Sequence, residues 1–367
     1  MPLIGVGVGL NRQRYGQFQN GYSSRVIADG GTIESLECVA AASSLLQSAS
    51  LLLIPSGYKA GVAYAELPAT GNGDLTWSRN SVANRTQSDG TIAQVAANVP
   101  RLSYMYGSCP ALLLEPQRTN LVFPSATATT QTRTVTAVAY TLSFWGTGSV
   151  TLSGVATATL NGTGANNRVT LTFTPTAGSL TLTVSGSVTN WQLEAGSYAT
   201  TLIDTTNAAA TRLVDTFTRN NIYTNGLISA SGGTWFLELR GNVAYTRDGT
   251  GNFWLGDSST GSGGTVNSLT FRNNGGGSSR LAINKVIGGT LTALYTTTTD
   301  TTKIAIKWNG TTADVFANGT KVVSATSFTA TNMEFLNGAA SDVPKFIQAM
   351  ALYPTPLSDA QCQTLTT

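Results

Sequence analysis

Short stretches in which apolar and polar residues alternate limit how this chain can fold more than any other feature. A period of two puts successive side chains on opposite faces of an extended strand. Between residues 126 and 205 such stretches follow one another closely, and glycine, asparagine or proline separates most of them. This pattern predicts a small β-sandwich. Its expected strands are 134–139, 140–145, 149–152, 156–160, 168–173, 179–184 and 189–193.

A second series of strand-like stretches begins at Gly233–Arg240, which reads GTWFLELR, and ends at Lys345–Tyr353. Within it, Asn318-Gly319 is the residue pair favoured in type I′ hairpin turns. After it, Ser358 is expected to cap a short C-terminal helix. The intervening strands are expected at 252–255, 268–272, 280–286, 291–295, 302–308, 312–316 and 320–324.

The composition supports a mainly β protein. The chain has 367 residues, which allows two or three domains, and only 11% of them are charged. Threonine, serine, glycine and asparagine are abundant, which favours strands and turns over helices. The net charge of +3 is dispersed and gives no basic surface for nucleic acid. Histidine is absent, which excludes every His-dependent catalytic triad.

The first part of the chain has a different character. Residues 1–36 are rich in glycine, arginine and polar residues and sustain no periodicity, so we expect an extended arm without its own core. Glu37–Ser50 is the best helix candidate, and 51–54 would either continue it or form a strand. The apolar segment Leu45–Ile54 is too short to span a bilayer, and the N-terminus does not resemble a secretory signal.

The three cysteines are Cys38, Cys109 and Cys362. They are far apart and lack CxxC spacing, which supports neither a zinc site nor a disulfide framework. A Cys38–Cys109 bridge is conceivable, but three free and mostly buried thiols are the preferred interpretation.

The stretch Gly73–Val122 is the most specific in the chain. It reads GDLTWSRNSVANRTQSDGTIAQVAANVPRLSYMYGSCPALLLEPQRTNLV. The order SRxSxAxR, a DG turn, PRxxY and LLLEPQRTN resembles a segment of tail-fibre-like and other virion surface proteins of tailed bacteriophages. There it often precedes a concanavalin-A-like (laminin-G-like) jelly roll. The run 188–206, VTNWQLEAGSYATTLIDTT, resembles the closing strand of carbohydrate-binding-module-like sandwiches of phage proteins.

This resemblance implies a virion structural protein, such as a fibre, spike or decoration subunit, that is made in the host cytoplasm and attaches to a host-surface glycan. By the habit of phage fibres it also implies a homotrimer. The expected division is an extended virion-anchoring arm, a short helix and strand region with a clasp segment, a small β-sandwich, and a concanavalin-A-like jelly roll. These parts would span 1–36, 37–125, 126–205 and 206–367.

Four charged residues stand out within Gly73–Val122: Arg79, Arg101, Glu115 and Arg118. Glu115 lies in an apolar run, and a buried carboxylate needs a guanidinium partner. An arginine offers a planar fork of donors for that purpose. One hypothesis is a receptor site built on Glu115 and Arg118. The preferred hypothesis is a structural clasp in which these four residues fix one long loop on the next.

The candidate sugar-binding residues lie in the run YTRDGTGNFWLGD. They are Tyr245, Arg247, Asp248, Asn252 and Trp254. An aromatic ring can stack on a pyranose while polar groups orient its hydroxyls. The alternative is that Trp254 belongs to the core and Asp248 only forms a turn. Core positions are likewise preferred for Trp191 and Trp308.

The same run contains a weak calcium candidate made of Asp248, Asn252 and Asp257, although their spacing is not that of a known calcium loop. No other cofactor is expected. Glycoside hydrolysis needs two carboxyl groups across a cleft. Glucanases that share the concanavalin-A-like fold carry their acids on one strand as ExDxxE, and this triplet is absent from the chain. The strand WFLELR carries a single acid, Glu238. We therefore expect a binding protein rather than an enzyme. A ligand-free stabilising protein is the alternative, and a glycan depolymerase is the less favoured one.

Overall fold

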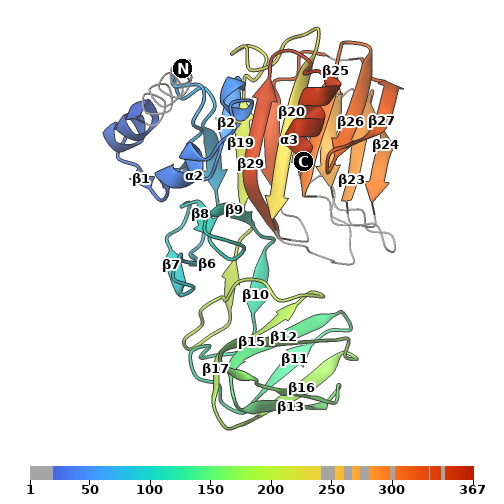
Figure 1. The fold of residues 1–367 in the computed structure, drawn as a ribbon. Coiled ribbons are helices and arrows are strands. Elements are labelled where there is room, and N and C mark those ends of the chain that lie inside the picture. Colours follow the sequence, from blue (N-terminus) through green and yellow to red (C-terminus); the bar gives the residue numbers. More distant parts are fainter. Residues whose placement is uncertain are drawn as a thin grey trace, which may run out of the picture.

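The computed structural model describes residues 20–240, 253–259, 267–272, 281–297, 302–329, 331–339 and 344–367. Their fold is mainly β, as expected, and forms two units (Figure 1). The connection between the units includes the antiparallel pair β10 (Arg118–Asn120) and β18 (Ala210–Arg212). In the described part of the chain no helix is long and apolar enough to cross a membrane.

The smaller unit is the sandwich expected from the alternating stretches, each of which overlaps an observed strand. One described sheet has the order β11-β16-β13-β14 and the other the order β15-β12-β17. Trp191 is fully buried between them, which confirms its core position. The strands are β11 (Gln131–Val135), β12 (Tyr140–Gly146), β13 (Ser149–Gly154), β14 (Ala158–Asn161), β15 (Gly164–Phe173), β16 (Gly178–Ser185) and β17 (Val188–Ala195).

The larger unit contains two more extensive sheets with an apolar core that includes Trp235, Phe253 and Trp308. The order of the first sheet, over the described residues, is β1-β3-β4-β5-β19-β28-β21-β22-β23-β24. Its strands are β1 (Thr32–Ile33), β3 (Gly57–Lys59), β4 (Val62–Ala63), β5 (Leu75–Ser78), β19 (Thr216–Asn220), β28 (Phe335–Ala339), β21 (Phe253–Gly256), β22 (Ser268–Arg272), β23 (Leu281–Ile287) and β24 (Thr290–Thr297).

The second sheet has the order β27-β26-β25-β20-β29-β9-β8, and β2 also pairs with β29. In the hairpin between β26 and β27, Asn318 and Gly319 have φ angles of 45° and 78°, which confirms the expected Asn-Gly turn. The strands are β27 (Thr320–Ser327), β26 (Thr312–Ala317), β25 (Lys303–Trp308), β20 (Gly233–Arg240), β29 (Lys345–Tyr353), β9 (Ala111–Leu114), β8 (Arg101–Ser103) and β2 (Leu51–Leu53).

These sheets differ from the division predicted from the sequence. Strand β5 pairs with β19, and both β2 and β9 pair with β29, so residues 37–125 contribute strands to the same sheets as residues 206–367. The small sandwich is therefore inserted into the larger unit. The reason is visible in β2 and β9, where consecutive leucines are buried on both faces and need neighbouring strands and layers.

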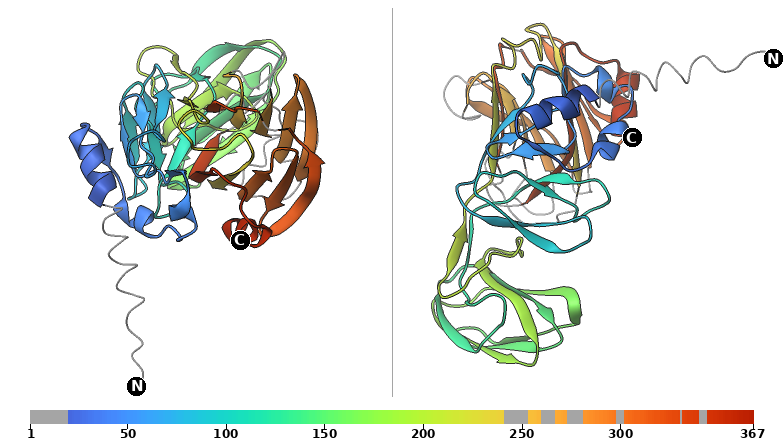
Figure 2. Two further views of the ribbon diagram at one scale, coloured as in Figure 1. Left: turned by 90° about the horizontal axis from the view of Figure 1, so that it is seen from above. Right: turned by 90° about the vertical axis from the view of Figure 1, so that its left-hand side faces the viewer.

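The N-terminal region differs from the expected extended arm. Residues 20–28 are helical, and this helix lies on the outer side of the larger unit (Figure 2). Its Tyr22 and Val26 are buried in a second apolar cluster that also covers the outer face of β20. Arg25 anchors the helix by an ion pair of 2.6 Å with Asp74. Residues 1–19 lie outside the described residues.

The long helix expected at Glu37–Ser50 is wrong. The structure has a short helix α2 (Leu36–Ala40), a turn, and a 3₁₀ helix η1 (Leu46–Ser48). Serine side chains form hydrogen bonds with the backbone here. The hydroxyl of Ser43 accepts from the N–H of Leu46, and the hydroxyl of Ser48 donates to the carbonyl of Leu45. Such local bonds compete with a continuous helix. At the other end, α3 (Asp359–Thr366) begins with the expected Ser358 cap, reinforced by Gln361 in a capping box.

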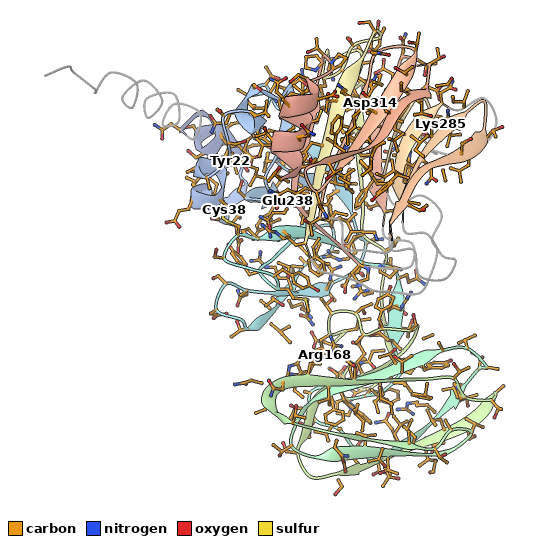
Figure 3. The ribbon with its side chains drawn as sticks, turned by 45° about the vertical axis from the view of Figure 1, so that its right-hand side comes forward. Tyr22, Cys38, Arg168, Glu238, Lys285 and Asp314 are labelled. Carbon is orange, nitrogen blue, oxygen red and sulfur yellow. A yellow bond between two sulfur atoms is a disulfide. The ribbon has the colours of Figure 1, made fainter. Side chains whose placement is uncertain are left out.

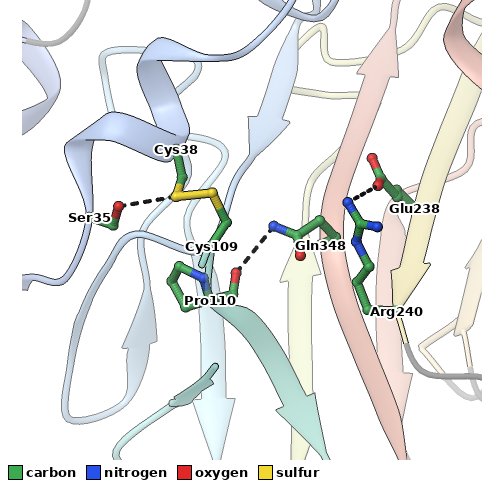
Figure 4. The surroundings of a disulfide bond; sticks show 7 residues. All are labelled: Ser35, Cys38, Cys109, Pro110, Glu238, Arg240 and Gln348. Carbon is green, nitrogen blue, oxygen red and sulfur yellow. Dashed lines mark hydrogen bonds and ion pairs between the residues drawn. A yellow bond between two sulfur atoms is a disulfide. The ribbon is translucent and has the colours of Figure 1, made fainter. Parts of the chain in front are cut away.

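The preferred interpretation of three free thiols is also wrong. Cys38 and Cys109 form a disulfide, with their Cα atoms 5.7 Å apart (Figure 4). The bridge joins α2 to the segment before β9, and these are 71 residues apart in the sequence. Cys362 of α3 is a free, buried cysteine. Spacing alone did not reveal the pair because the fold brings distant segments together.

Candidate functional site

The outer face of the β15-β12-β17 sheet is polar and turns toward the larger unit. Strand β12 alternates strictly: Leu142 and Phe144 enter the sandwich core, whereas Ser143 and Trp145 point the other way. The neighbouring strands extend this face, because Arg168 stands opposite Trp145. Gln192 likewise stands opposite Ser143, and both are fully buried. The sheet thus presents one half-buried tryptophan at the end of a polar surface.

Arg168 fixes the position of this tryptophan. Its guanidinium carbon lies 4.7 Å from the centre of the Trp145 ring, a cation–π contact. The same guanidinium donates to the carbonyl of Thr200 at 2.6 Å and to the hydroxyl of Ser143 at 2.8 Å. Figure 3 shows Arg168 on the side of the small sandwich that faces the larger unit. Trp145 is therefore held in one orientation by its own sheet.

The opposite wall comes from the larger unit. It consists of the hairpin between β6 (Ala83–Thr86) and β7 (Ile92–Val95), together with Met105 and Tyr106 after β8. The ring of Tyr106 packs edge-on against Phe346 with 4.7 Å between ring centres, yet 42% of its surface is exposed. Partial burial raises the pKa of the Tyr106 hydroxyl. Tyr106 is thus a supported aromatic side chain that reaches solvent.

Between the two walls lies a cleft of about 740 Å³, which we call the interdomain cleft. It combines two accessible aromatic side chains with amide, hydroxyl and guanidinium groups. Its lining includes Arg85, Asp89, Tyr106, Trp145, Asn166, Arg168 and Asn190.

A buried ion network lies beside the cleft and joins the two units. Arg101 donates to Glu115 at 2.6 Å and also to Asp215, and all three side chains are at most 2% exposed. Arg212 lies 3.0 Å from Glu115, and Arg79 lies 3.0 Å from Asp215. Burial opposes ionisation of Glu115, but Arg212 and Arg101 outweigh it and lower its pKa to about 2. Glu115 is therefore a fixed anion at neutral pH.

Of the four residues predicted to form the clasp, the structure brings Arg101 and Glu115 into direct contact. Arg79 joins them through Asp215. Arg118 packs on Tyr198, and its guanidinium carbon lies 5.3 Å from the centre of the Tyr198 ring. Sequence reasoning missed Arg212 and Asp215, which lie close together in TRLVDTF. Nothing in that run distinguishes a buried ion pair from ordinary surface charges.

The sugar-binding run predicted from the sequence lies largely outside the described residues. This holds for Tyr245, Arg247, Asp248 and Asn252. Trp254 is described: it is half-buried on β21, with Phe253 and Leu255 in the core on the other face. It stands between Thr270 and Asn337 of the neighbouring strands.

Asp257, the third residue of the calcium candidate, accepts hydrogen bonds from the backbone and side chain of Asn267. Among the described residues, no group of three or more Cys, Asp or Glu side chains lies close enough together to hold a metal ion. Trp308 occupies a core position, as the sequence predicted, and 1% of its surface is exposed. Glu238 pairs with Arg240 of its own strand at 3.1 Å (Figure 4).

Trp145, Tyr106 and Arg168 were not predicted as site residues. A signal for Trp145 existed: in YTLSFWG it has the opposite parity to Phe144 and Leu142, so it had to leave the core. No comparable signal existed for Tyr106, because its position depends on how the two units pack.

No protein-family model matches the sequence, and no curated protein matches it. Several solved structures are partly similar in three dimensions. A mutant sialidase of Trypanosoma rangeli with trans-sialidase activity aligns at a TM-score of 0.31 and 9% identity, over 41% of this chain and 25% of that one. The binding domain of botulinum neurotoxin DC, in complex with rat synaptotagmin II, aligns at 0.31 and 11%, over 42% and 40%.

The CBM40 of the Ruminococcus gnavus IT-sialidase, bound to α2,3-sialyllactose, aligns at a TM-score of 0.26 and 15% identity. That alignment covers 38% of this chain and 84% of the other. This chain thus spans a quarter of the sialidase it aligns with, and each of the three alignments leaves more than half of this chain uncovered.

Proposed function

We propose that this chain binds glycans of a host cell surface through the interdomain cleft, as a surface subunit of a tailed-bacteriophage particle. The observation that carries the glycan proposal is that Trp145 and Tyr106 line one cleft together with Asn166 and Asn190. Aromatic faces stack on the apolar faces of pyranose rings, and amides orient the hydroxyls.

The cleft fits binding better than hydrolysis. A glycosidase needs one carboxyl group that is protonated near neutral pH and a second one across the scissile bond. Glu115 has a pKa of about 2 and is occupied by Arg101 and Arg212. Asp89, the other acid of the described lining, is exposed, and hydrogen bonds from Thr91 lower its pKa. Neither carboxyl group is suited to act as a proton donor.

The particle assignment is supported by the sequence resemblance of Gly73–Val122. In this proposal the residues before the helix of 20–28 attach to other virion proteins, and the docked helix transmits that attachment to the larger unit. Several copies on one particle, in a trimer if the resemblance holds, would turn weak single contacts into strong adhesion. Deleting residues 1–19 keeps residues 20–28, the described part of the helix. It should abolish incorporation into particles while the protein still folds; normal incorporation contradicts the anchor.

The glycan proposal is tested by applying the full-length protein to host cells and to a glycan array. Trp145→Ala should lose about tenfold or more in affinity, because it removes the stacking surface. Leu291→Ala is a matched truncation of an exposed side chain (45%) on β24 and should bind like the unchanged protein. Equal binding of Trp145→Ala and Leu291→Ala contradicts a ligand site in the cleft.

A second candidate function is particle stabilisation without a ligand. It is favoured by the outer face of the β11-β16-β13-β14 sheet, where the exposed side chains are small and uncharged. Such a face loses little side-chain entropy and desolvates no charge when it is covered. These residues include Thr132, Thr134, Thr151, Ser153, Thr159 and Thr183. If the protein stabilises the particle, the double variant Thr151→Glu and Thr183→Glu should be released from particles. If the protein binds glycans through the cleft, the same variant should bind glycans as the unchanged protein does.

A further inference from the structure

We infer that the interdomain cleft selects uncharged oligosaccharides and discriminates against sugars that carry a carboxylate. This inference rests on the proposed glycan binding and names its ligand class. It follows from how the charges around the cleft are already used within the protein.

The cations of the described lining are committed to internal partners. Arg85 is buried and pairs with Glu34 at 3.1 Å, and it also donates to the carbonyl of Leu102 at 2.9 Å. Arg168 donates to Thr200 and Ser143 and lies over the ring of Trp145. Contacts within the protein thus hold both guanidinium groups in place.

The anions point to the same conclusion. Glu115 is neutralised by Arg101 and Arg212 and also accepts from the backbone and hydroxyl of Thr201. Asp89 is different, because it is exposed and its described hydrogen bonds come only from Thr91. Asp89 therefore presents a negative charge to the cleft, and this charge repels a ligand carboxylate.

The groups that stay accessible suit a neutral sugar. Trp145 and Tyr106 offer aromatic surface, and the exposed Asn166 offers both a donor and an acceptor. A sugar hydroxyl or acetamido group needs such neutral partners, whereas a buried carboxylate without a cation is costly. The volume of about 740 Å³ falls within the range of about 300–1,000 Å³ of small-ligand pockets, so a short oligosaccharide fits.

The test uses the full-length protein and an array that displays each glycan core in an uncharged form and in a sialylated or uronic-acid form. Uncharged members should bind, and the acidic form of each bound core should bind about tenfold more weakly. Binding should change less than about twofold between 50 and 500 mM NaCl, because no ion pair with the ligand is screened.

Asp89→Asn gives a sharper second readout. The amide oxygen can still accept from Thr91, so the turn is preserved while the charge is removed. This variant should bind acidic forms several-fold better than the unchanged protein does. The difference in affinity between uncharged and acidic forms should therefore be smaller in the variant.

Preferred binding of acidic forms, with a loss of about tenfold or more at high salt, overturns the inference and leaves the glycan proposal standing. An array on which nothing binds, together with host-cell binding that Trp145→Ala does not alter, overturns both.

Discussion

The guanidinium of Arg101 lies 2.6 Å from the carboxylate of Glu115, and both side chains are almost completely buried. Around this pair, Asp215 and Arg212 arrive from the strand region after the small sandwich, and Thr201 arrives from its closing loop. The pair therefore ties the chain entering the small sandwich to the chain leaving it. The shape of the interdomain cleft depends on this connection.

Removing the charge of Glu115 should destabilise the protein strongly. Glu115→Gln leaves Arg101 and Arg212 buried with less compensation, and breaking a buried pair costs roughly 3–5 kcal/mol. The free energy of unfolding from urea titration measures this loss. Arg118→Ala is the control, since it removes a cation–π contact and a hydrogen bond with Tyr198, which together should cost less, about 1–2 kcal/mol. Equal losses for the two variants contradict the central place of Glu115.

Acid should weaken the same connection. The pKa of Glu115 is about 2 in the folded protein, below its ordinary value of 4.5. Its stabilisation is therefore complete above about pH 4.5 and is lost as the pH falls toward about 2. Unfolding free energies measured from pH 5 to pH 2.5 should fall less steeply in Glu115→Gln. Parallel curves for the two proteins contradict this assignment.

Raising the pH above about 5 should lower the stability of the protein through a different carboxyl group, that of Glu66. Burial raises its pKa from 4.5 to about 8, despite hydrogen bonds from Ser56 and from the backbone of Ile54. The folded state thus holds the proton more tightly than the unfolded state. This stabilisation is complete below about pH 4.5 and is lost as the pH rises toward about 8. Melting temperatures from pH 5 to pH 8.5 should decline less in Glu66→Gln than in the unchanged protein.

The disulfide should contribute substantially to stability. Closing a loop between positions 71 apart lowers the entropy of the unfolded chain by an amount worth about 4 kcal/mol. Cys38→Ser should lower the unfolding free energy by a comparable amount, as measured without reductant. The double variant with Cys109→Ser should be little worse than the single one. Two additive losses would mean that the bond is not formed.

The strands could largely be predicted because their cause is local. Period-two alternation and turn residues located the strands of the small sandwich, and Asn318-Gly319 located a hairpin. The cap at Ser358 was equally local. A single residue and its near neighbours contain the physical reason for each of these features.

The candidate site could not be predicted in the same way because it arises from packing. Tyr106 and Trp145 line the same cleft only because the small sandwich is inserted between β10 and β18. The pairing of Cys38 with Cys109 and of Arg101 with Asp215 also joins segments that are distant in the sequence. The apolar run around Glu115 indicated that its carboxylate needed a cation, but not which arginine would supply it.

The most direct test of the cleft as a glycan site is the NMR signal of the Trp145 indole N–H during titration with an oligosaccharide that binds the protein. Trp145→Phe assigns the signal. Trp191 is the internal reference, because its indole is buried and donates to the carbonyl of Pro124 at 2.7 Å. We predict that the Trp145 signal shifts with ligand concentration while the Trp191 signal does not. Saturable binding that leaves the Trp145 signal unchanged would contradict the account.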